Sequence, residues 1–149
     1  MRNRYRKGIT VYIDEHLPSE LKNPFQEASL RTIEIAKTKK YAGRDEFDYI
    51  HELLSENAIF VTSDSEFIRK VIDHDTKHAG IVHIPEVGEK SEKIALAQLI
   101  AEFIRGLLDS SSSSVHNKIF YLSHDGLHMR ENGKDTLVIS LGWLNNIRK

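Results

Sequence analysis

The stretch AIFVTSDSEF, residues 58–67, joins a short apolar run to an acidic, helix-compatible end. Its first five residues are mostly β-branched or aromatic, which is typical of a buried parallel strand. A second run of this kind, TVYI at residues 10–13, also ends in acid, at Asp14 and Glu15. Because the carboxyl ends of parallel strands meet at one edge of a sheet, we expect the acids after both runs to share a cleft.

The rest of the chain predicts the sheet to which these two strands belong. Two more strands are expected at residues 31–36 and 80–84. Helices are expected at residues 21–28, from Asp45 to Asn57, around residues 67–72 and at residues 89–108. This alternation predicts an α/β fold, in which a parallel sheet carries helices on both faces.

The C-terminal part follows a different pattern. Five serines, Ser110 to Ser114, predict a linker between an α/β domain at residues 1–109 and an extension at residues 115–149. The pairs Asp125-Gly126 and Asn132-Gly133 are strong hairpin signals. The extension is therefore predicted to be an antiparallel β-hairpin or three-stranded meander, which either continues the sheet or packs separately.

Composition indicates a globular protein and limits the classes of site. The chain has 149 residues, 40% of them hydrophobic and 29% charged, and a formal net charge of -1. No bulk positive charge favours nucleic acid, so such binding would depend on local patches. The absence of cysteine excludes disulfides and thiolate metal sites. The apolar stretch after the basic N-terminus stops at Asp14, so we expect no membrane span and a cytoplasmic location.

Acids gathered at two strand ends predict a metal site. Crowded carboxylates raise one another's pKa, and a divalent cation with oxygen ligands, Mg²⁺ or Mn²⁺, relieves their repulsion. Asp14 and Asp64 are the strongest candidates, and Glu66 follows in the next helical turn. Asp45 and Asp48 are rivals for a further ligand. Each acid also has a structural interpretation, as a helix cap, a dipole partner or part of a solvated face.

Polar and basic residues near these acids are candidates for binding a substrate. The hydroxyls that follow the central strand could support Asp64 or contact phosphate, and basic residues could attract an anionic backbone. A solvated basic loop is an equally good interpretation of the cations. The candidate substrate-binding residues are Glu15, His16, Thr62, Ser63, Lys39, Lys40, Arg44 and Arg69.

Several motifs together resemble one known family. The motif VYIDEHLP at residues 11–18 and the motif VTSDSEF at residues 61–67 resemble the two signatures of the PIN-like domain family (DUF5615 type), which is related to VapC-type PIN ribonuclease toxins. The segments DEFDYI at residues 45–50 and HAGIVHI at residues 78–84 are similar to their counterparts there. Glu66 stands where the family usually has Asp, and His16 stands where it usually has Asn.

The resemblance implies a PIN-like fold and Mg²⁺- or Mn²⁺-dependent cleavage of RNA. Asp14, Asp64 and Glu66 would be the catalytic acids, and Asp45 or Asp48 would complete the metal ligands. The relation to toxins also implies an antitoxin protein or a second copy of the chain as partner. Two alternatives remain open: a receiver-like, Mg²⁺-binding signalling domain, in which Asp64 would accept a phosphoryl group, and a PIN-like interaction module without catalysis.

Overall fold

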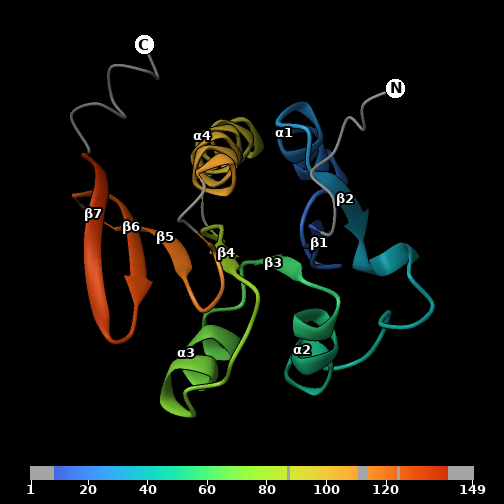
Figure 1. Cartoon of the computed structure of the whole chain (residues 1–149). Coiled ribbons are helices and arrows are strands. Elements are labelled where there is room, and N and C mark those ends of the chain that lie inside the picture. Colours follow the sequence, from blue (N-terminus) through green and yellow to red (C-terminus); the bar gives the residue numbers. More distant parts are fainter. Residues whose placement is uncertain (1–8, 87, 111–113, 124, 141–149) are drawn as a thin grey trace.

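A single mixed sheet forms the centre of the protein (Figure 1). The structure, a computed structural model, describes residues 9–86, 88–110, 114–123 and 125–140. Seven strands lie in the order β2-β1-β3-β4-β5-β6-β7. In chain order they are β1 (Thr10–Ile13), β2 (Arg31–Glu34), β3 (Ala58–Thr62), β4 (Ile81–His83), β5 (Ile119–Ser123), β6 (Gly126–Glu131) and β7 (Lys134–Ser140). Neighbours from β2 to β5 pair in parallel, and β5, β6 and β7 pair antiparallel.

Helices cover both faces of the parallel part, which confirms the predicted α/β class. They are α1 (Lys22–Glu27), α2 (Glu46–Ser55), α3 (Ser65–Asp73) and α4 (Lys90–Asp109), with 3-10 turns at Ser19–Leu21 and Ile35–Lys37. Figure 1 shows α1 and α4 on one face of the sheet and α2 and α3 on the other. Within the described residues, no helix combines the length and the apolar composition needed to cross a bilayer.

The central strand β3 is buried along its whole length. Because side chains alternate across a strand, its residues serve two cores. Ile59 and Val61 pack on the α1 and α4 side, and Phe60 packs on the α2 and α3 side. This explains why its sequence is a continuous apolar run and not an alternation of apolar and polar residues.

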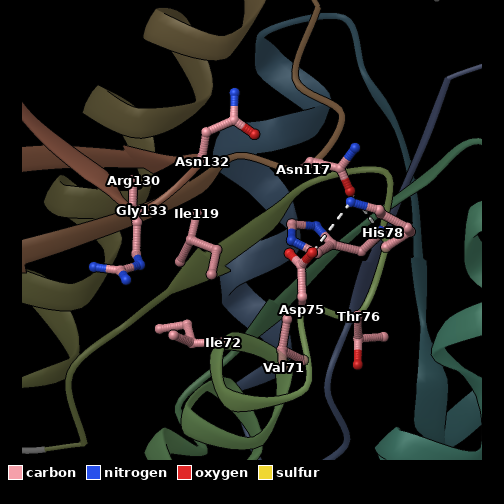
Figure 2. A pocket seen from close by; sticks show the side chains of 11 residues that line it. Val71, Ile72, Asp75, Thr76, His78, Asn117, Ile119, Arg130, Asn132 and Gly133 are labelled. Carbon is pink, nitrogen blue, oxygen red and sulfur yellow. Dashed lines mark hydrogen bonds and ion pairs between the residues drawn. The ribbon is translucent and has the colours of Figure 1, made fainter.

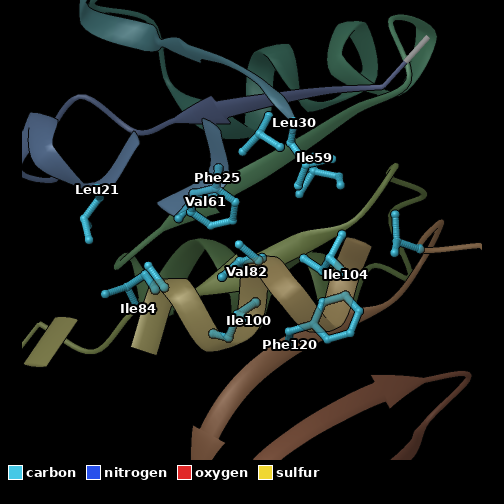
Figure 3. Packing of buried hydrophobic residues seen from close by; sticks show 14 of the residues in the cluster. Leu21, Phe25, Leu30, Ile59, Val61, Val82, Ile84, Ile100, Ile104 and Phe120 are labelled. Atoms are coloured by element: carbon cyan, nitrogen blue, oxygen red, sulfur yellow. The ribbon is translucent and has the colours of Figure 1, made fainter. Parts of the chain in front are cut away.

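The larger core lies between the sheet and α4 (Figure 3). The apolar face of this helix brings Ile100 and Ile104 against Val82 and Phe120 of neighbouring strands. The helix begins with a capping box, in which Glu89 and Glu92 satisfy each other's backbone N–H groups. Hydrogen bonds between residues close in sequence therefore fix where α4 begins, and burial of its apolar face fixes where it lies on the sheet.

The structure corrects the expected end of the parallel sheet. Four parallel strands were expected from the alternation, but β5 also pairs in parallel with β4, Ile81 beside Ile119. The helix α4 is thus the crossover to a fifth parallel strand. The Asp125-Gly126 signal concerns only the turn from β5 to β6, and it says nothing about the other edge of β5. The meander therefore continues the sheet, the first of the two alternatives; most of the serine segment before it lies outside the described residues.

Two predicted helix caps are confirmed. The Asp45 side chain accepts a hydrogen bond from the Phe47 N–H at 2.8 Å, and Asp64 accepts one from the Phe67 N–H at 3.0 Å. After α2 the backbone turns at Asn57 with φ of 58°, a left-handed conformation that asparagine tolerates. Local sequence therefore sets where α2 and α3 begin and brings Asp64 to the end of β3.

Candidate active site

The candidate site lies at the switch point of the sheet, where successive strands are added on opposite sides. The chain leaves β1 for β2 on one side, and it leaves β3 for β4 on the other. Strands β1 and β3 are direct neighbours, with Ile13 beside Val61, and the Asp14 N–H donates to the Val61 carbonyl at 2.9 Å. In open α/β sheets such a switch point, at the carboxyl ends of the strands, is where ligands bind. The prediction that both strand ends meet is confirmed.

A buried hydroxyl connects the two aspartates. Thr62 is fully buried, and its Oγ1 donates to Asp14 Oδ2 at 2.7 Å. The same oxygen accepts from the Asp64 N–H at 3.1 Å. Thr62 therefore fixes the Asp14 carboxylate and the start of α3 in one network. Its burial makes it a supporting residue for the acids, the first of the two roles considered for it.

The Asp14 carboxyl is almost entirely removed from solvent, at 4% exposure. Burial raises its pKa above the usual range, because the charged form loses hydration. The hydrogen bond from Thr62 and the nearby imidazole of His16 act in the opposite direction. Such a buried carboxyl at a strand end favours any ligand that brings positive charge to it.

A third acid, Glu46, lies close to the two aspartates, and it was not among the residues predicted for the site. It is the first residue of α2, and its carboxyl forms a hydrogen bond with that of Asp64. Burial, this bond and the charges of Asp14 and Asp64 together raise the pKa of Glu46 to about 7. For Asp64, burial acts to raise the pKa, but hydrogen bonds from Glu46 and from backbone N–H groups, with the charge of Lys70, lower it. Glu46 therefore keeps its proton to a higher pH than Asp64 does.

One signal in the sequence could have identified Glu46. Asp45 was expected to cap α2, and a capping side chain is turned back onto its own helix. The next residue, Glu46, is then the first of the helix, and α2 leads directly into β3, the strand that ends at Asp64. Only the packing of α2 against β3 shows that this turn lies next to Asp64.

The two rivals for the further ligand position are exposed. Asp45 is exposed and engaged as the helix cap, and Asp48 is exposed on α2. Glu66 has a side chain that is 82% exposed, and it pairs with Arg69 at 3.7 Å. The structure therefore brings Asp14 and Asp64 together with Glu46, whereas the side chains of Asp45, Asp48 and Glu66 are exposed.

The predicted basic residues are mostly paired with acids outside the site. Lys40 Nζ contacts Glu56 Oε2 at 3.2 Å, and Arg44 contacts Glu52 Oε2 at 2.8 Å. Lys39 is exposed. Glu15, beside Asp14, accepts from the Gly43 N–H at 3.2 Å and so ties the loop before α2 to the strand end. These contacts indicate a structural role for the loop at residues 38–45.

A cavity of about 510 Å³ adjoins the aspartates. Its polar lining includes two predicted residues, His16 and Ser63, and two that were not predicted, Glu86 and Lys93. The Ser63 hydroxyl donates to the Ile84 carbonyl at 2.6 Å, which ties the end of β3 to the end of β4. The residues that line the cavity are Asp14, His16, Leu17, Pro18, Ser63, Asp64, Glu86 and Lys93.

The donor chemistry of the acid cluster fits a hard divalent cation. Asp14, Glu46 and Asp64 offer only oxygen atoms, which Mg²⁺ and Mn²⁺ prefer. In the arrangement that the described residues adopt, no three His, Asp or Glu side chains are placed to hold an ion directly. In the metal-free protein Glu46 keeps a proton up to about neutral pH, because its pKa is raised. Loss of that proton would make the third carboxylate available.

A second cavity, of about 430 Å³, lies away from the acids (Figure 2). Figure 2 shows Arg130 on one side of it and His78 and Asn117 on the other. The polar groups here already have partners: His78 Nδ1 accepts from the Gly80 N–H at 3.1 Å, and Arg130 contacts Asp135 at 3.4 Å. Burial lowers the pKa of His78 to about 4, so this ring is neutral at pH 7. We assign this cavity no chemistry.

The raised pKa of Glu46 gives a testable pH dependence. Metal must displace its proton, so we expect Mn²⁺ affinity to rise about tenfold per pH unit up to pH 7 and to level off above it. In metal-free protein the same pKa also sets the direction in which folding stability changes with pH. A raised carboxyl pKa contributes stability below its unfolded value of about 4.3, and this contribution is lost as pH rises through about 7. Titration calorimetry from pH 5.5 to 8 measures the first effect, and urea unfolding measures the second.

The matched variant for this experiment is Glu46→Gln. It keeps the shape of the side chain and removes the titrating proton. We expect weak Mn²⁺ binding at every pH and a flatter stability profile between pH 4.5 and 7. A metal affinity that still rises tenfold per pH unit in Glu46→Gln would show that another group carries the titration.

Comparison with known proteins gives no assignment: no family model, curated protein or solved structure matches the chain. A function must therefore be inferred from the chemistry of the site.

Proposed function

We propose that this protein is a phosphodiester hydrolase that uses Mg²⁺ or Mn²⁺ to cleave RNA. The observation that carries the proposal is the meeting of Asp14, Asp64 and Glu46 at the switch point of the sheet, with Asp14 and Asp64 lining one cavity. Carboxylates at strand ends with shifted pKa values are typical of sites that bind a cation and do proton chemistry. The resemblance of residues 11–18 and 61–67 to the PIN-like family supports the same reaction.

Each residue of the cluster would have a separate role. Asp14, Asp64 and deprotonated Glu46 would hold the cation, which when bound lowers the pKa of a water and stabilises charge on phosphate oxygens. Thr62 orients Asp14 through the bond at 2.7 Å, and the Phe67 N–H orients Asp64. In the metal-free protein Glu46 holds a proton near neutral pH, which a bound cation would displace. The cavity beside the acids gives a phosphodiester room to approach.

Cleavage of single-stranded RNA tests this proposal. Wild-type protein and Asp64→Asn are incubated with a mixed RNA pool in Mn²⁺, in Mg²⁺ and in EDTA, and products are separated on a gel. We expect cleavage by wild type in the two metals, none in EDTA, and none by Asp64→Asn in any condition. Cleavage that persists in EDTA, or equally in Asp64→Asn, would point to a contaminating nuclease and remove the support for this function.

A receiver-like role is a second candidate, and one observation favours it. The order β2-β1-β3-β4-β5 is the order of the flavodoxin-like class, to which receiver domains belong. Asp64 follows the third strand, where the phosphoacceptor is expected. The last parallel strand, β5, is however followed by His124-Asp125-Gly126 and not by lysine. Acetyl phosphate with Mg²⁺ separates the candidates, because only a receiver would gain a phosphoryl group on Asp64.

Several biological roles stay predictions. These are an antitoxin partner, a homodimer, a cytoplasmic location and a module that binds without catalysis. The last of these predicts metal binding without RNA cleavage, so the cleavage experiment above distinguishes it.

A further inference from the structure

The cavity beside the acids is also lined by a cation, Lys93. Asp14 and Asp64 come from the ends of β1 and β3, while Lys93 comes from the first turn of α4. Figure 1 shows α4 on the sheet face opposite α2, the helix that supplies Glu46. The acids and Lys93 thus approach the same region from different elements. A cavity lined both by carboxylates and by an ammonium suits a ligand that brings a metal ion and a phosphate together.

The ammonium of Lys93 is held by a neutral group. Its Nζ donates to the main-chain carbonyl of Glu86 at 2.9 Å. A lysine has three N–H donors, so this bond fixes the head group and leaves donors for a ligand. The carbonyl does not neutralise the charge of the ammonium.

Other cations near the site differ in this respect. Lys40, Arg44 and Arg69 are paired with Glu56, Glu52 and Glu66. Lys70 carries a charge that acts on Asp64, but it does not line the cavity. His16 also lines the cavity, but its side chain is exposed. Lys93 combines a place in the cavity with a positive charge that an acid does not cancel in the contacts described.

We propose that Lys93 is the residue that binds a phosphate of single-stranded RNA, in the cavity that Asp14 and Asp64 also line. This inference rests on the proposed function for its choice of ligand. Lys93 would act as a point charge that holds the backbone while the acids hold the cation. It adds to the site a residue that lies 29 positions from Asp64 in sequence, beyond the reach of either motif.

The test measures RNA binding apart from cleavage. Fluorescence anisotropy follows a labelled single-stranded oligonucleotide in Ca²⁺, an ion with oxygen ligands, and a gel confirms that the RNA stays intact. We expect Lys93→Gln to raise the Kd roughly 10- to 100-fold, the effect of losing a charge-assisted hydrogen bond. The slope of log affinity against log salt should become shallower by about 0.7, one phosphate contact. Lys93→Arg should restore most of the affinity.

Lys90→Gln is the matched control, because Lys90 lies in the same helical turn and pairs with Glu20 at 2.8 Å outside the cavity. It should bind RNA like wild type. Equal Kd and salt slope in Lys93→Gln and Lys90→Gln would overturn the inference, as would wild-type protein that binds no RNA. Mn²⁺ affinity should be unchanged or higher in Lys93→Gln, whereas a fall would indicate damage to the site and overturn the assigned role. The cleavage experiment decides the proposed function independently, since RNA binding can be lost or kept whatever its result.

Discussion

Replacing Asp14 by asparagine is expected to reduce metal-dependent RNA cleavage at least about 1000-fold, the scale of several kcal/mol of lost metal-assisted stabilisation. Asp14 is 4% exposed and is oriented by Thr62, so the loss of its charge cannot be replaced by a mobile neighbour. The fold should survive the change. The side-chain oxygen of asparagine can still accept the hydrogen bond from Thr62. The neutral amide also avoids burying a charge, and burial of that charge is what raises the pKa of Asp14. Single-turnover cleavage in Mn²⁺ measures the first effect, and thermal unfolding measures the second.

Asp48→Asn is the control for this substitution. It makes the same chemical change on an exposed acid of α2 that does not line the cavity. We expect cleavage within about twofold of wild type, in line with the small effects of surface substitutions. A comparable loss in Asp48→Asn would mean that the acid set of the active protein differs from the one described. Cleavage by Asp14→Asn within tenfold of wild type would remove Asp14 from the proposed metal site.

Truncating Phe60 to alanine is expected to destabilise the protein by about 3–5 kcal/mol, the usual range for a buried phenylalanine. Phe60 has no exposed surface, and it lies edge-on to Tyr49 of α2 and Phe67 of α3, with ring centroids 5.9 and 5.6 Å away. Its removal would leave a cavity between both helices and the strand that carries the acids. Urea unfolding followed by circular dichroism gives the change in free energy.

The same truncation at an exposed apolar position is the comparison. Leu137 of β7 is 46% exposed, and Leu137→Ala should change the free energy of unfolding by no more than about 0.5 kcal/mol. We also expect Phe60→Ala to weaken Mn²⁺ binding, because α2 and α3 position Glu46 and Asp64. A Phe60→Ala protein as stable as wild type would mean that the core between the sheet and α2 is looser than its burial indicates.

Several features of the fold could be predicted because their causes are local. The continuous apolar run at residues 58–62 identified a doubly covered strand, since its alternate side chains serve two cores. Asp45 and Asp64 marked helix starts, because a capping side chain bonds to its own first turn. The glycine turns at residues 126 and 133 gave the antiparallel meander. The meeting of Asp14 and Asp64 also followed, because parallel strand ends share one edge.

Other features depended on tertiary packing alone. The pairing of β5 with β4 is decided by which edge of the sheet is open and by the burial of Phe120 under α4, and no residue in β5 encodes it locally. Glu46 reaches Asp64 because α2 packs on β3, and Lys93 reaches the cavity because α4 crosses the opposite face. The sequence by itself determined the two aspartates and the strands that carry them. Only the tertiary structure decided their partners, because the distance between side chains from different elements depends on how those elements pack.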